Sequence, residues 1–133
     1  MATDEALLLD THTFLWASFA PKRLSKNAKE WLTKRDTILW LSVASIWEIE
    51  VKHRGGQLQA DARVVDASMR NLSVRALPIG VEHVRALAAL SFGLNSCPDP
   101  FDRLIAVQAM VEKLPLVTKD EAFRGFDGVE VRW

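Results

Sequence analysis

The sequence has one cysteine, no long apolar run, and no repeat, low-complexity segment or linker rich in proline, glycine or serine. A lone Cys97 excludes a disulfide framework within the chain and fits a reducing compartment. No apolar stretch approaches the roughly 18 residues of a membrane span. The opening residues, MATDEALLLDTHTF, carry two acids and no basic segment, so we expect no signal peptide. We therefore expect a cytoplasmic protein with no membrane contact.

The chain also lacks net charge, because 17 Lys and Arg residues balance 17 Asp and Glu residues. Zero net charge argues against a protein that coats nucleic acid through electrostatic attraction alone. It leaves room for an enzyme that acts on nucleic acid, because the local distribution of charge matters more than the sum. The length of 133 residues and the 49% hydrophobic content predict one domain, residues 1–133, with its own core.

Short apolar runs alternate with helix signals, such as Ser25 and Asp61 as N-caps and Gly55-Gly56 as a helix end. This order predicts an α/β/α sandwich with a mainly parallel, about five-stranded sheet. In such a sheet, sites gather at the carboxyl ends of the strands, where Asp10 and Asp120 fall. The expected strands are residues 6–9, 37–41, 74–77, 116–118 and 129–132. The expected helices are residues 13–20, 26–34, 43–54, 62–71, 82–90, 99–113 and 120–123.

Several acids lie in apolar surroundings, where a buried carboxylate is costly unless it is paired, hydrogen-bonded or bound to a cation. Carboxylates that share a cleft also raise one another's pKa, and a divalent metal relieves both costs. Oxygen-only ligand sets suit hard cations such as Mg²⁺ or Mn²⁺. The acids concerned are Asp10, Glu48, Glu50, Asp99, Asp102 and Asp120.

Each of these acids also has a purely structural interpretation. Asp10 and Asp120 could cap the helices that follow them. Asp99, with proline next and Asp102 three residues later, fits an N-cap with two charges at a helix N-terminus.

Glu48 and Glu50 could form a charged stripe on their helix. At about 100° per residue, Glu50 falls nearer the centre of the apolar arc of Val43, Ile46 and Trp47 than Glu48 does. Periodicity therefore favours Glu50 as the functional acid, or neither. The basic residues available for pairing are Lys52 and Arg54.

Other chemistries find little support. The sequence has no Walker loop, no GxGxxG and no HExxH, and Cys97 lacks the context of a nucleophile. A phosphatase with an N-terminal DxD nucleophile is disfavoured, because the second Asp is missing after Asp10. The three histidines are scattered along the chain, at His12, His53 and His83.

The acid-bearing segments, taken together, resemble the PIN-domain family, and more narrowly the VapC-type toxins of type II toxin–antitoxin pairs. The resemblance covers nearly the whole chain, and its four motifs occur in the same order and spacing. The segments are LLLDTHTFLW, SVASIWEIEVKHRGGQL, DPFDRLIAVQA and LVTKDEAF.

The resemblance implies a Mg²⁺- or Mn²⁺-dependent ribonuclease. It implies that Asp10 and Asp102 hold the principal metal ion, with Asp99, Asp120 and Glu48 completing the site directly or through water. The resemblance thus selects Glu48, whereas helical periodicity favours Glu50 or neither. It places the hydroxyl of Thr118 beside the fourth acid as a supporting group.

Two positions depart from the family pattern. Similar sequences often carry His where Cys97 stands, and a small or apolar residue where Glu50 stands. Glu50 is then an additional outer acid, paired with Arg54 or Lys52. Basic residues at the rim are expected to hold the RNA backbone, each with the alternative of an ordinary surface charge or ion pair. They are Arg103, Lys119, Arg124, Lys52 and Arg54.

The resemblance also implies partners: a homodimer, and a small VapB-type antitoxin that neutralises the toxin and often inserts a basic side chain in the acidic site. Two alternatives stay open. One is a PIN-fold nuclease that processes RNA outside a toxin pair. The other is an interaction module of the same fold without catalysis.

Overall fold

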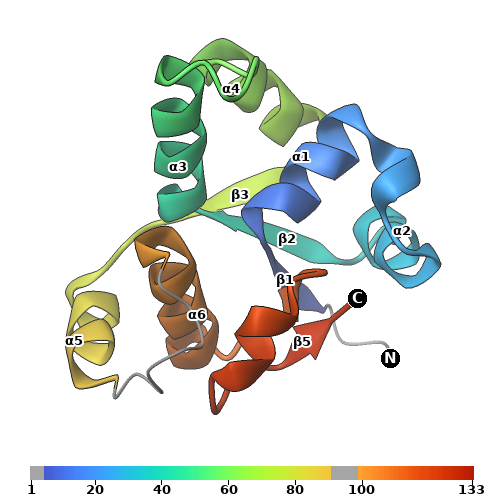
Figure 1. Ribbon diagram of the computed structural model, residues 1–133. Helices are drawn as coiled ribbons and strands as arrows, with labels where there is room; N and C mark the ends of the chain where they lie inside the picture. The colour runs from blue at the N-terminus through green and yellow to red at the C-terminus, as the bar shows by residue number, and fades with distance from the viewer. Residues whose placement is uncertain (1–4, 91–98) are drawn as a thin grey trace.

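The computed structural model describes residues 5–90 and 99–133, and Figure 1 shows their arrangement around one sheet. All four strand pairings are parallel, in the order β3-β2-β1-β4-β5. The predicted parallel five-stranded sheet is therefore confirmed. The strands are β1 (Ala6–Leu9), β2 (Ile38–Ser42), β3 (Val74–Leu77), β4 (Leu116–Val117) and β5 (Val131–Arg132).

Helices connect the strands and cover both faces of the sheet. Ser25 and Asp61 act as N-caps as expected, because their side chains accept from the backbone N–H groups of Ala28 and Val64. The helices are α1 (Thr11–Phe19), α2 (Lys26–Thr33), α3 (Val43–Arg54), α4 (Ala62–Asn71), α5 (Val81–Ala89) and α6 (Pro100–Glu112), with 3₁₀ turns η1 (Pro21–Arg23) and η2 (Glu121–Gly125).

The core is divided by the sheet into two layers, as the alternation of side chains along β1 shows. Leu7 and Leu9 pack on one face with residues of α1 to α4, such as Phe14. Leu8 packs on the other face with residues of α6 and η2, such as Ile105 and Phe123. The predicted three-layer α/β/α sandwich is therefore present.

The main boundary error is at α1, which begins at Thr11 rather than at residue 13. Asp10 caps this helix, because its Oδ1 accepts from the Thr11 N–H at 2.8 Å. The helix thus starts directly at the carboxyl end of β1, and the chain needs no loop between them. No helix in the described segments is both long enough and apolar enough to cross a bilayer.

Candidate active site

The carboxyl edge of the sheet places Asp10 between the ends of β1 and β4. These two strands are neighbours at the point where the strand order reverses, which is where sites form in open parallel sheets. Asp10 is 5% exposed, and Thr118 Oγ1 donates to its Oδ2 at 2.8 Å. Thr118 Oγ1 also accepts from the Asp120 N–H at 3.0 Å, so one hydroxyl links the two acid-bearing segments. Burial raises the pKa of Asp10, although the hydrogen bonds from the Thr118 hydroxyl and the Thr11 N–H lower it.

Glu48 reaches the same region from α3 and is 2% exposed. Its Oε1 lies 2.7 Å from Thr11 Oγ1, and its Oε2 lies 2.6 Å from Lys52 Nζ. Ser45 Oγ lies 2.8 Å from the same Thr11 hydroxyl. Thr11 therefore joins the helix that follows Asp10 to the helix that carries Glu48.

The helical-wheel argument for Glu50 is wrong. The buried face of α3 consists of Ala44, Ser45, Glu48 and Ile49, whereas Trp47 is 58% exposed. Val43, from the same apolar arc, is also exposed. The wheel placed the buried face at Val43, Ile46 and Trp47, but Val43 and Trp47 face out, and the hydrogen-bonded Ser45 and Glu48 share the buried face with Ala44 and Ile49.

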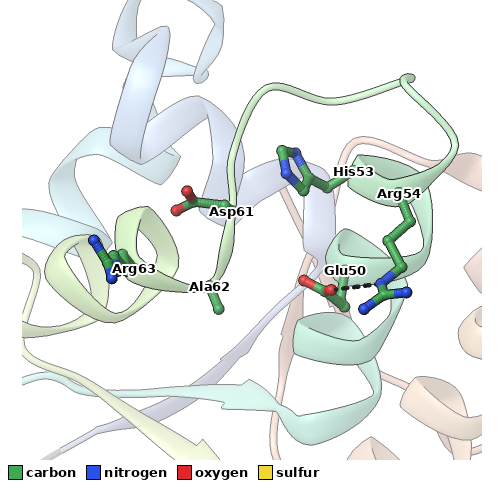
Figure 2. A pocket seen from close by; sticks show the side chains of 6 residues that line it. All are labelled: Glu50, His53, Arg54, Asp61, Ala62 and Arg63. Atoms are coloured by element: carbon green, nitrogen blue, oxygen red, sulfur yellow. Dashed lines mark hydrogen bonds and ion pairs between the residues drawn. The ribbon is translucent and has the colours of Figure 1, made fainter.

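Glu50 lies on the outer side of α3, where its Oε1 is 3.2 Å from Arg54 Nε. Of the two pairings expected for Glu50, the one with Arg54 is present. Glu50 and Arg54 line a pocket between the end of α3 and the start of α4, together with Asp61 (Figure 2). Glu50 is thus not placed to support the acids around Asp10.

Asp99 and Asp102 come from the N-terminus of α6. Asp99 is the N-cap, and its Oδ1 accepts from the N–H groups of Phe101 at 2.8 Å and Asp102 at 3.2 Å. The capping interpretation is therefore correct for Asp99. Both bonds use Oδ1, so a cap and a ligand role do not compete for the same atom.

Asp102 shows that the five acids of the resemblance come together. Burial raises its pKa to about 7, and the charges of Asp10, Asp99, Glu48 and Asp120 contribute in that order. Burial disfavours the ionised form of Asp102, and each neighbouring carboxylate disfavours it further, so the acids lie close enough to repel one another. We call these five residues the acid cluster.

Asp120 is the exposed member of the acid cluster. Its Oδ1 accepts from the Ala122 N–H at 2.9 Å, so it also caps η2. A pocket of about 380 Å³ lies beside it, and His12 and Trp16 of α1 form part of the wall, with ring centroids 5.9 Å apart. The sequence analysis treated His12 as scattered, but its position two residues after Asp10 places it in the first turn of α1. The pocket is lined by Asp10, His12, Trp16, Lys119, Asp120 and Glu121.

Three of the five basic residues expected at the rim bind acids of the chain. Besides Lys52 and Arg54, Arg124 Nε lies 2.9 Å from Glu121 Oε2. Lys119 is exposed in the pocket beside Asp120. Arg103 lies half-buried in the first turn of α6. Cys97 falls outside the described residues.

A second group of possible ligands, Glu82, His83 and Glu112, lies at the other end of α6. Glu112 follows Asp102 by ten residues, which is about 15 Å along a helix. His83 Nδ1 accepts from the Gly80 N–H at 2.9 Å, so its proton is on Nε2, the atom that faces both carboxylates at 4.0 and 3.9 Å. A protonated nitrogen cannot ligate a metal, and this group is therefore not a metal centre in this arrangement.

Fold and site thus define a three-layer α/β protein with a carboxylate cluster at the edge of its parallel sheet. Comparison with known proteins agrees with this fold. A model of the PIN domain family matches residues 7–129. Ribonuclease VapC22 of Mycobacterium tuberculosis is 30% identical over 119 residues, which are 89% of each chain.

Solved structures share the fold. VapBC2 from Rickettsia felis, bound to a promoter DNA fragment, matches with a TM-score of 0.70 at 14% identity, over 96% of this chain and 97% of the other. DNA-bound VapBC from Salmonella typhimurium matches with a TM-score of 0.70 at 18% identity and the same coverage. The chain belongs to the PIN domain family and is of the VapC type.

Proposed function

We propose that this protein is a divalent-metal-dependent ribonuclease that hydrolyses RNA phosphodiester bonds. The observation that carries the proposal is that β1, α3 and α6 bring Asp10, Glu48 and Asp102 to one edge of the sheet, where burial and the charges of the other acids raise the pKa of Asp102 to about 7. Like charges are gathered in this way where a cation is to be bound. The ribonuclease name of the relative that is 30% identical supports the activity.

The donor set fits Mg²⁺ or Mn²⁺, because every member of the acid cluster offers carboxylate oxygen. Asp10 and Asp102 would hold the ion, with Asp99 and Asp120 completing its ligands. A divalent ion bound there lowers the pKa of a coordinated water and neutralises charge on the phosphate.

The protein's own groups would orient the reaction. The Thr118 hydroxyl and the Thr11 N–H fix the two oxygens of Asp10. Asp120, which is exposed beside the pocket, would accept a proton from an attacking water. Glu48, whose oxygens contact Thr11 and Lys52, is less suited to that role.

The substrate would approach over the pocket that contains Lys119. A lysine beside the acids can bind an RNA phosphate. Replacing Lys119 should weaken RNA binding and reduce its salt dependence without changing metal binding.

We also propose that the protein is the toxin of a toxin–antitoxin pair, forms a homodimer and binds a VapB-type antitoxin. The structures from Rickettsia felis and Salmonella typhimurium are VapBC assemblies, and each of them matches 96% of this chain. Growth arrest on expression, relieved by a neighbouring antitoxin gene, would support this role over a nuclease that acts outside such a pair.

The activity can be tested by mapping cleavage ends in cellular RNA after pulse expression. Wild type should generate new ends, and Asp10→Asn should generate none, because the change removes a carboxylate charge from the cluster while an amide oxygen can still accept hydrogen bonds. Asp66→Asn is the matched control, since Asp66 is an exposed acid on α4, and it should cleave like wild type. Cleavage by Asp10→Asn at wild-type rate would overturn the proposal.

A further inference from the structure

The ion pair between Glu48 and Lys52 lies within the acid cluster. The Glu48 side chain is 3% exposed and that of Lys52 is 32% exposed, with Nζ and Oε2 2.6 Å apart. Partial burial lowers the pKa of Lys52, but the hydrogen bond to Glu48 and the charges of Glu48, Asp99 and Asp102 outweigh it, so the pKa is raised. Lys52 is thus a positive charge held beside Glu48, Asp99 and Asp102.

Lys52 makes Glu48 different from Asp10. Asp10 accepts hydrogen bonds from the Thr118 hydroxyl and from a backbone N–H. Neither donor is charged, so these bonds do not neutralise the Asp10 carboxylate. Glu48 is instead neutralised by an ammonium group on one of its two oxygens. A divalent ion on the Glu48 side would have to displace that ammonium or sit beside a like charge.

The same helix carries a second ion pair, two residues further along the chain, with which this pair can be compared. Glu50 and Arg54 have the same spacing as Glu48 and Lys52, but their side chains are 43% and 82% exposed. Such exposed pairs contribute little and are screened by solvent and salt. The burial of Glu48 therefore singles out the Lys52 pair as part of the site.

We propose that Lys52 is the resident counter-ion on the Glu48 side of the acid cluster and limits each chain to one tightly bound divalent ion. The ion would be held by the aspartates, while Lys52 takes the place that a second ion would need. A second ion about 4 Å from the first would need further carboxylate oxygens, and those of Glu48 are already bound to the Thr11 hydroxyl and to Lys52. This inference rests on the proposed metal-dependent function and specifies its stoichiometry.

The test is calorimetric titration of metal-free protein with Mn²⁺. Wild type should bind one ion, and Lys52→Gln should bind a second, because Glu48 is then uncompensated. Lys52→Arg keeps the charge and should restore the single ion. Arg54→Gln is the matched control, with the same change of charge on the same helix, and should bind one ion as wild type does.

A double variant, Glu48→Gln with Lys52→Gln, avoids leaving a buried charge alone and should bind one ion. Two ions in this double variant, or a single ion in a folded Lys52→Gln, would overturn the inference. Two ions in a wild type that cleaves RNA would overturn the inference alone. A wild type that binds no Mn²⁺ would overturn both the inference and the metal-dependent function.

Discussion

At the scale of single residues, Asp102 shows the electrostatic cost of gathering the acids. Its pKa rises from 3.8 to about 7, first through burial and then through the charges of the other four acids. In the absence of metal, ionising this group works against folding. The cluster therefore trades stability of the metal-free protein for a strong site for a cation, as functional sites often do.

The pH dependence of stability should show this cost. The folded state binds more protons than the unfolded state between the two pKa values of Asp102, so the free energy of unfolding should fall as pH rises from about 4 to about 7. Asp102→Asn should reduce this fall and make the metal-free protein more stable than wild type at about pH 8. Urea unfolding in EDTA measures both, and an unchanged pH profile in Asp102→Asn would contradict the account.

Sequence reasoning at this scale succeeded where an acid follows a strand and failed where it sits on a helix. Asp10 could be located because it ends an apolar run at the edge of a parallel sheet. Glu48 could not be located by periodicity, because its burial depends on a hydrogen bond to Thr11 of another helix, as well as on the ion pair with Lys52 of its own helix. Only the resemblance to PIN domains selected Glu48 over Glu50.

At the scale of elements, the N-terminus of α6 combines a structural and a functional role. Asp99 caps the helix through Oδ1 and contributes to the raised pKa of Asp102. The helix dipole favours negative charge at this end, which partly offsets the repulsion between the two acids. A ligand role for Asp99 through Oδ2 would therefore leave the cap intact.

Substitution of Asp99 should separate the two roles. Asn is about as good an N-cap as Asp, whereas Ala costs about 1 kcal/mol, so Asp99→Asn should keep the stability of the metal-free protein and Asp99→Ala should lose that amount. Both variants should bind Mn²⁺ more weakly than wild type if Asp99 is a ligand. Thermal unfolding and calorimetry measure the two effects. Unchanged Mn²⁺ affinity in Asp99→Asn would leave Asp99 a cap only.

Most element boundaries follow from local signals. β1, α3 and β3 occur at the predicted residues because short apolar runs and a Gly55-Gly56 end define them. The start of α1 was missed because the Asp10 side chain both caps the helix and enters the acid cluster. A residue with two roles gives a weaker signal for either one.

At the scale of the whole molecule, the zero net charge reflects two opposed sets of charges. The acid cluster concentrates negative charge at one edge of the sheet, and metal binding would neutralise that charge.

The assignment of residues 1–133 to one domain and the formation of a homodimer stay predictions.

RNA affinity should accordingly depend on bound metal. Asp10→Asn with Mn²⁺ and metal-free wild type should both bind a short RNA more weakly than metal-loaded wild type does, because phosphate is repelled by an uncompensated acid cluster. Fluorescence anisotropy with a non-cleavable RNA measures this at fixed salt. Equal affinity of the metal-free and metal-loaded wild type would contradict the electrostatic argument.

The most direct test of the central claim is cleavage of labelled RNA by metal-free protein before and after Mn²⁺ is restored. The account predicts no cleavage in EDTA, cleavage by wild type once Mn²⁺ is added, and no cleavage by Asp10→Asn in either condition. Cleavage by wild type in EDTA, or cleavage by Asp10→Asn at the wild-type rate with Mn²⁺, would contradict the claim that the acid cluster is a metal-dependent nuclease site.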